Sequence, residues 1–110
     1  MSAQVPFAVT LSVELRLLAP DEGGRSAPVF SGLRPLCQFT KPGEEVVTVG
    51  MCQLELVDVD EMKPGESARG LLRFAPGVED LVRKLAEVSP EVGLAEGRRI
   101  IGTARITAVE

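Results

Sequence analysis

The chain has 110 residues, 45% of them hydrophobic and 25% charged, with a net charge of −4. This length and composition predict one folded domain spanning residues 1–110, and they exclude disorder, which requires low hydrophobicity and high net charge. The acidic balance and the absence of Trp and Tyr disfavour an autonomous nucleic-acid-binding protein, which needs a basic field and aromatic side chains for stacking.

The chain shows no signal for a membrane, a metal or a cofactor. No apolar run approaches the roughly 20 residues of a membrane span, and the N-terminus has no basic region or cleavage pattern, so we expect a cytoplasmic protein. Cys37 and Cys52 lie in apolar segments without metal-ligand spacing and are predicted to be buried thiols. His is absent, which removes the commonest general base and any His-based metal site.

The clearest element is a strand from Val9 to Ala19. Apolar residues alternate with polar ones over this stretch (VTLSVELRLLA), which is the period of a strand buried on one face. Pro20 ends the strand. The segment from Asp21 to Pro35, DEGGRSAPVFSGLRP, then predicts a loop of defined shape, because its glycines permit positive φ and its prolines fix φ.

Three further strands are expected at residues 33–40, 46–60 and 67–75, separated by Lys-Pro-Gly turn signals. Gly50 is a position at which the expected strand at residues 46–60 bends or splits. Residues 78–88 change period, since their apolar side chains recur every three or four positions; this predicts one short amphipathic helix. Residues 97–110 form a turn and a last strand. Together these elements indicate an all-β, six-stranded antiparallel barrel with one inserted helix.

Three motifs in order resemble the C-terminal β-barrel (domain III) of bacterial elongation factor Tu. Residues 14–39, ELRLLAPDEGGRSAPVFSGLRPLCQF, resemble the family's strand, DEGGRHTPFF loop and GYRPQFYF strand. The turn MKPGE at residues 62–66 resembles VMPGD, and residues 95–110, AEGRRIIGTARITAVE, resemble REGGRTVGAGVVAKV. The resemblance covers nearly the whole chain from Val9 and implies the fold of that barrel.

The chain departs from the family pattern at several positions. Ser26 replaces a His, Leu33 replaces a Tyr, and Arg98 replaces the second Gly of the REGGR turn. The helical segment fills a spacing that is longer than in the family. The GxxxxGK[ST] loop that holds GTP phosphates is missing, so no nucleotide is expected to bind and the chain is not a complete elongation factor.

The resemblance also implies candidate contact residues. In the full-length factor this barrel touches the T stem of aminoacyl-tRNA, the GTPase domain and the nucleotide-exchange factor. The matching positions for tRNA are Arg34, Glu96 and Gly97, with Lys41 near a further contact, and Arg25 matches the GTPase-domain interface. Arg98 and Arg99 would join Arg25 and Arg34 in a basic patch if the two loops meet. The alternative is structural: the arginines bond loop carbonyls, and Gly97 serves a turn.

Three functions follow from these observations. The first is a non-catalytic module that binds a protein partner, linked to translation or mimicking the factor. The second is an accessory domain that binds tRNA through the residues just named. The third is an enzyme, which we disfavour because adjacent carboxylates such as Asp58 and Asp60 lack the spacing of a calcium loop, and Ser26 and Ser31 have no partner base in the sequence. We therefore expect no enzyme, no cofactor and no metal.

Overall fold

The computed structural model describes residues 7–40, 43 and 45–110. Its elements, in chain order, are β1 (Val9–Leu17), the 3-10 turn η1 (Pro20–Glu22), β2 (Val29–Phe30), β3 (Leu36–Thr40), β4 (Val46–Met51), β5 (Gln53–Leu56), β6 (Glu61–Met62), β7 (Ser67–Phe74), α1 (Glu79–Val88), β8 (Glu91–Glu96) and β9 (Arg99–Val109). The prediction of an all-β chain with a single helix is confirmed for these residues.

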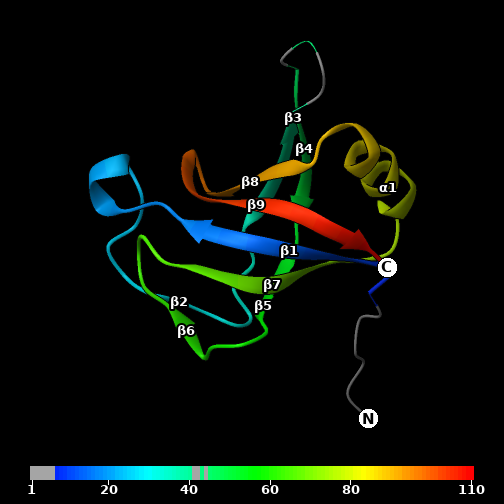
Figure 1. Cartoon of the computed structure of the whole chain (residues 1–110). Helices are drawn as coiled ribbons and strands as arrows, with labels where there is room; N and C mark the ends of the chain where they lie inside the picture. Colours follow the sequence, from blue (N-terminus) through cyan, green and yellow to red (C-terminus); the bar gives the residue numbers. More distant parts are fainter. Residues whose placement is uncertain (1–6, 41–42, 44) are drawn as a thin grey trace.

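Seven of the strands form one antiparallel sheet in the order β4-β3-β8-β9-β1-β7-β5, and β2 pairs with β6 beside it. The sheet curls into a half-barrel: β3 and β4 run across the direction of β8, β9 and β1 (Figure 1). This curl lets one face of the sheet enclose the apolar side chains.

The strand β1 lies in the interior of the sheet, next to its middle strand β9. It pairs with β7 on one side and with β9 on the other, so its backbone is hydrogen-bonded along both edges. The five side chains of its apolar face are each at most 2% exposed: Val9, Leu11, Val13, Leu15 and Leu17. The alternation seen in the sequence is therefore the alternation between the core and the outer face of the sheet.

The outer edge of β5 is bonded to the segment that leads into β3. Gly32 N–H donates to Leu54 O (2.8 Å), Leu54 N–H donates to Leu33 O (2.8 Å), and Cys52 N–H donates to Pro35 O (3.0 Å). The strand β5 is one edge of the curled sheet. These bonds therefore join that edge to the segment before β3, and β3 lies next to the other edge strand, β4.

The strand count differs from the six expected, because the described residues form nine strands. The predicted strand at residues 46–60 splits into β4 and β5. Gly50 takes φ +111°, the register with β3 shifts beside it, and the buried Cys52 separates the two strands. The short pair β2 and β6 has only two residues in each strand and offers no period to detect.

The strand β8 was not predicted from the sequence. It pairs with β3 on one edge and β9 on the other, so both of its edges are hydrogen-bonded. Its sequence, EVGLAE, does not alternate, and Leu94 and the adjacent Ala95 are both buried. A register shift with β9 between these two residues accounts for the adjacent burial.

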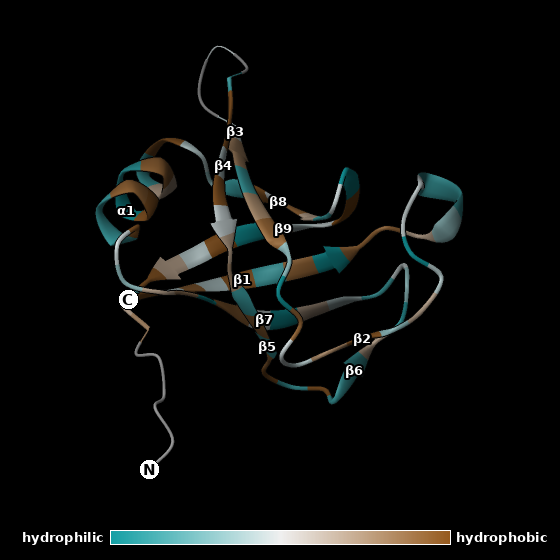
Figure 2. Ribbon diagram, turned by 180° about the vertical axis from the view of Figure 1, so that it is seen from behind, coloured by the Kyte–Doolittle hydropathy of each residue, from teal (hydrophilic) through white to brown (hydrophobic). Residues whose placement is uncertain are grey.

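The helix α1 begins one residue later than predicted, because Val78 serves as its N-cap residue. Val82 and Leu85 are buried, whereas Leu81 and Val88 of the predicted apolar face are 43% and 49% exposed. The helix lies beside the sheet next to β9, with apolar and polar residues on different sides (Figure 2). Within the described residues, no helix is long and apolar enough to cross a membrane.

Two glycines allow a matched test of the packing. A Cβ on Gly70 of β7 would lie 2.5 Å from Leu15 Cδ1 and 2.9 Å from the Glu55 carbonyl oxygen, whereas the nearest atom to a Cβ on Gly93 of β8 is 3.7 Å away. We therefore expect Gly70→Ala to lower the free energy of unfolding by about 1–3 kcal/mol, and Gly93→Ala to change it by less than about 0.5 kcal/mol. Urea denaturation of both variants measures this difference; equal effects would contradict the packing described here.

Candidate partner-binding surface

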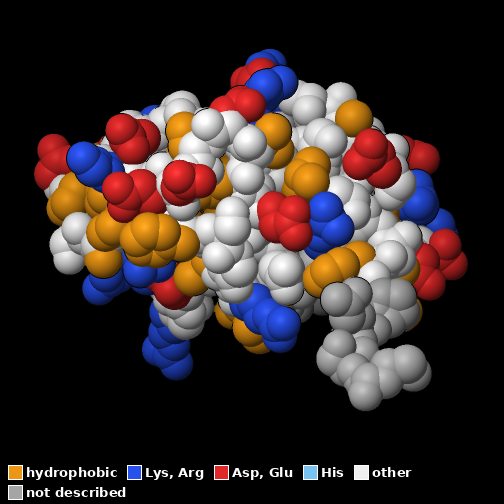
Figure 3. All heavy atoms as spheres, turned by 90° about the horizontal axis from the view of Figure 1, so that it is seen from below, with side chains coloured by type: hydrophobic (Ala, Val, Ile, Leu, Met, Phe, Trp, Pro, Cys, Tyr) orange, Lys and Arg blue, Asp and Glu red, His pale blue; other side chains and the backbone are white. Residues whose placement is uncertain are grey.

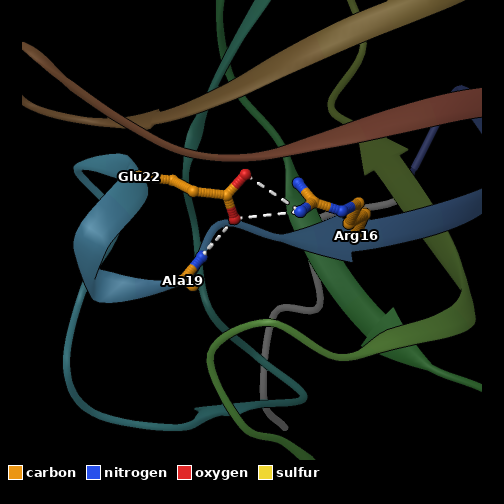
Figure 4. A network of polar contacts seen from close by, with 3 residues as sticks. All are labelled: Arg16, Ala19 and Glu22. Atoms are coloured by element: carbon orange, nitrogen blue, oxygen red, sulfur yellow. Dashed lines mark hydrogen bonds and ion pairs between the residues drawn. The ribbon is translucent and has the colours of Figure 1, made fainter.

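The loop after β1 is held by the carboxylate of Glu22. Ala19 N–H donates to Glu22 Oε1 (2.9 Å), and Arg16 Nη2 donates to both Glu22 oxygens at 2.9 and 3.0 Å (Figure 4). Glu22 lies in η1 and Arg16 in β1, so this contact anchors the loop to the central strand. These donors, the Ala19 N–H above all, lower the pKa of the Glu22 carboxyl below its ordinary value.

The two glycines of this loop have different roles. Gly23 takes φ +91°, in the left-handed region, and its N–H donates to Pro20 O at 3.1 Å. Gly24 has no room for a side chain, because a Cβ there would collide with the carbonyl group of Leu18. One glycine is thus required by its dihedral angle and the other by close approach of the backbone.

The structure brings the loop after β1 and the β8–β9 turn together, as the hypothesis of a joint patch requires. Arg25 Nη1 and Glu96 Oε1 form an ion pair at 3.0 Å between residues 71 positions apart. Gly97 takes φ +61° in the turn, and Arg98 and Arg99 are exposed beside it. Arg25 therefore bonds to a carboxylate, and among the residues that the structure describes it has no hydrogen bond to the loop carbonyls that the structural alternative named.

Arg34 does not join this group among the described residues. It is exposed, and its Nη2 lies 3.5 Å from Gln53 Oε1 on β5. Lys41, the remaining candidate, lies outside the described residues. The predicted set therefore divides into a cluster formed by Arg25 and Glu96 with the adjacent turn, and a separate contact at β5.

Several of the other basic side chains that the structure describes are neutralised locally. Besides Arg25, four arginines form ion pairs at 2.7–3.1 Å: Arg16 with Glu22, Arg69 with Asp58, Arg73 with Glu55, and Arg105 with Glu14. The two hydrogen bonds from Arg69 lower the pKa of Asp58. This pairing lowers the positive charge that these arginines offer to a polyanion.

An exposed apolar surface was missed by the sequence analysis. Phe30 of β2 pairs with Glu61, and the Oγ of the adjacent Ser31 accepts a hydrogen bond from Leu56 N–H (2.9 Å). Both ends of the segment between β5 and β6 therefore lie beside Phe30. That segment carries Val57 and Val59, and the three side chains are 55%, 52% and 43% exposed.

We call Phe30, Val57 and Val59 the Phe30 patch. Hydrophobic side chains gather on the face of the molecule seen from below, among acidic and basic ones (Figure 3). Val57 directly follows Leu56 and breaks the alternation of the strand sequence, and this break was the one signal available for the patch. Its location beside Phe30 depends on the pairing of β2 with β6 and was not visible in the sequence.

The two thiols are buried, as predicted. Cys37 is fully buried and Cys52 is 2% exposed. Contact with Cys52 and burial together raise the pKa of the Cys37 thiol well above its ordinary value, which favours the neutral thiol. No group of three or more potential metal ligands is found in the part of the chain that the structure describes.

Comparison with models of known protein families finds no match for this chain, and no curated protein matches it either.

The anchor at Glu22 predicts a pH dependence. Because its pKa is lower in the folded state than its ordinary value of 4.5, the carboxylate contributes stability above that value, and the contribution is lost as the pH falls through the folded pKa. We expect Glu22→Gln to destabilise the protein at pH 7 and to lose this effect in acid. Urea denaturation between pH 7 and about pH 3 measures it, with Asp21→Asn as the matched control. A destabilisation independent of pH would contradict the ionic anchor.

Proposed function

We propose that the chain is a non-catalytic interaction module that binds a protein partner through the Phe30 patch. The observation that carries this proposal is the exposure of Phe30, Val57 and Val59, each more than two-fifths exposed, on β2 and on the segment between β5 and β6 whose two ends lie beside it. Contiguous exposed apolar side chains are typical of surfaces that bind proteins, and a central aromatic side chain is typical of the residues that dominate such binding.

We also propose that the fold is a six-stranded barrel of the elongation factor Tu C-terminal type, in which β4 and β5 count as the two halves of one strand and the short pair β2 and β6 is added. Two observations support this assignment. Hydrogen bonds join residues 32–35, which lead into β3, to Cys52 and to Leu54 of β5 at the edge of the curled sheet. The ion pair between Arg25 and Glu96 joins the two motifs, DEGGR and EGRR, on which the resemblance rests.

The charges around the patch indicate the chemistry of the partner. Asp60 and Glu61 are exposed, whereas the Asp58 carboxylate is balanced by Arg69 at 2.7 Å. A surface with an apolar centre and Lys or Arg at its rim would complement this arrangement. If the module mimics the translation factor, the partners with such a surface belong to translation: the factor itself, its exchange factor, or a toxin or protease that acts on it.

A structural role is favoured for the groups considered as catalytic. The Ser31 hydroxyl accepts the Leu56 N–H and so holds two segments together. Asp58 forms a bidentate ion pair with Arg69. Each of these groups has a partner that explains its position without a substrate.

The proposal is tested by capturing partners from cell lysate with three forms of the protein. Phe30→Asp places a charge at the centre of the patch, and we expect capture of a translation component to fall at least about tenfold, the effect of losing about 1.4 kcal/mol of binding free energy. Leu81→Asp is the control, because Leu81 is an exposed apolar residue on α1. Circular dichroism checks that the variants fold. Capture that is unchanged by Phe30→Asp, or that yields no translation component, would contradict the proposal.

The alternative of tRNA binding is favoured by one observation, the exposure of Arg98 and Arg99 in the turn beside the Arg25–Glu96 pair. The net charge of −4 and the local pairing of arginines oppose it. We expect no saturable retention of bulk tRNA on filters at protein concentrations up to about 100 µM at low salt, where phosphate contacts are strongest. Saturable binding that is lost in Arg98→Ala/Arg99→Ala would establish the alternative.

A further inference from the structure

A second feature of the surface, separate from the Phe30 patch, is a hollow of about 240 Å³ lined by Phe7, Arg34, Met51, Cys52, Gln53, Arg73 and Ala75. Its lining brings together the end of β4, β5, β7, the segment before β3, and Phe7, two residues before β1. The charged side chains that line it are both arginines: Arg34 forms no ion pair with another described residue, and Arg73 is paired with Glu55, which lies outside the lining.

The polar groups of the hollow are arranged in a row. Gln53 on β5 is directly opposite Arg73 on β7 in the register of the two strands. Arg34 approaches Gln53 from the other side, with Nη2 at 3.5 Å from Gln53 Oε1. Because Oε1 of Gln53 accepts from Arg34, the N–H donors of the Gln53 amide remain for another acceptor. Arg34, Gln53 and Arg73 thus present donors to one small space.

One of these donors has no partner. Arg73 Nε is buried and has no hydrogen-bond acceptor among the described residues. The carboxylate of Glu55 bonds a different nitrogen of the same guanidinium, Nη2, at 3.1 Å, and Glu55 is not part of the lining. A buried N–H without an acceptor costs free energy, and an oxyanion in the hollow would remove that cost.

The remaining walls are apolar. The Arg73 guanidinium lies over the Phe7 ring, with Cζ 5.8 Å from the ring centroid, and Met51, which is 60% exposed, also lines the hollow. The contact with Phe7 holds the guanidinium in place. Two guanidinium groups match the planar or tetrahedral arrangement of oxygens in carboxylate and phosphate groups.

We propose that this hollow, formed by Arg34, Gln53, Arg73 and Phe7, binds a small organic oxyanion. The anionic group, a phosphate or a carboxylate, accepts hydrogen bonds from Arg34, the Gln53 amide and Arg73 Nε. The organic part packs against Phe7 and Met51. This site does not depend on the Phe30 patch, and its ligand is small, since the volume of the hollow admits only a few heavy atoms beyond the anionic group.

The test is a titration followed by NMR, in a buffer free of phosphate and carboxylate. Phenyl phosphate is the probe, inorganic phosphate tests the anionic group alone, and benzyl alcohol tests the apolar part alone. We expect phenyl phosphate to shift the ¹H–¹⁵N signal of Arg73 Nε–H saturably. Inorganic phosphate shifts the same signal with weaker affinity, and benzyl alcohol does not shift it.

Two variants locate the binding. Arg34→Gln removes an exposed charge that forms only the long contact with Gln53, and we expect it to weaken phenyl phosphate binding at least about tenfold, since charge-assisted hydrogen bonds are the strong ones. Arg69→Gln is the matched control: it lies on the same strand, β7, but pairs with Asp58 outside the hollow, and binding should be unchanged.

Either of two results would overturn the proposal. The first is the absence of a saturable shift at Arg73 Nε–H with phenyl phosphate up to about 10 mM, a concentration that reveals even weak sites. The second is equal weakening in Arg34→Gln and Arg69→Gln, which would indicate unspecific attraction to positive charge. If Arg34→Gln lowers tRNA retention while phenyl phosphate leaves Arg73 unshifted, the residue serves a polyanion and the small-ligand site is wrong.

Discussion

The burial of alternate side chains on β1 is the constraint on which the rest of the structure depends. Five apolar residues of one strand occupy the core, and the backbone of the same strand is paired on both edges. The strands β9 and β7 are therefore fixed relative to one another through β1. The strand β8, next to β9, leads into the turn beside Arg25. The strand β5, next to β7, forms one side of the hollow.

The loops take their shape from contacts with this framework. Glu22 joins the loop after β1 to Arg16 on the same strand, and Arg25 joins it to the β8–β9 turn. In an acidic protein, most arginines find a carboxylate nearby, and exposed ion pairs of this kind contribute little stability. Their effect is on the surface charge. Among the described residues, the apolar Phe30 patch and the Nε–H of Arg73 are features that these ion pairs leave without a partner.

The elements with a strong period were predictable, and those defined by their neighbours were not. The alternation of β1 and the three- and four-residue spacing of α1 are visible in the sequence and are present in the structure. The strand β8 has no alternation because a register shift buries Leu94 and Ala95 together. The division of residues 46–60 at Cys52 also depends on strand pairing, because β4 pairs with β3 whereas β5 pairs with β7.

The sequence by itself determined the central strand, the helix, the loop that begins at Asp21 and the burial of both thiols, because each rests on local periodicity, dihedral preference or side-chain polarity. Only the tertiary structure decided that Arg25 meets Glu96, that Phe30 lies exposed beside Val57, and that Arg73 keeps an unpartnered N–H next to Arg34. These three outcomes join residues from distant segments. They follow from strand order and register, which are set by the packing of the whole sheet and not by any single stretch of residues.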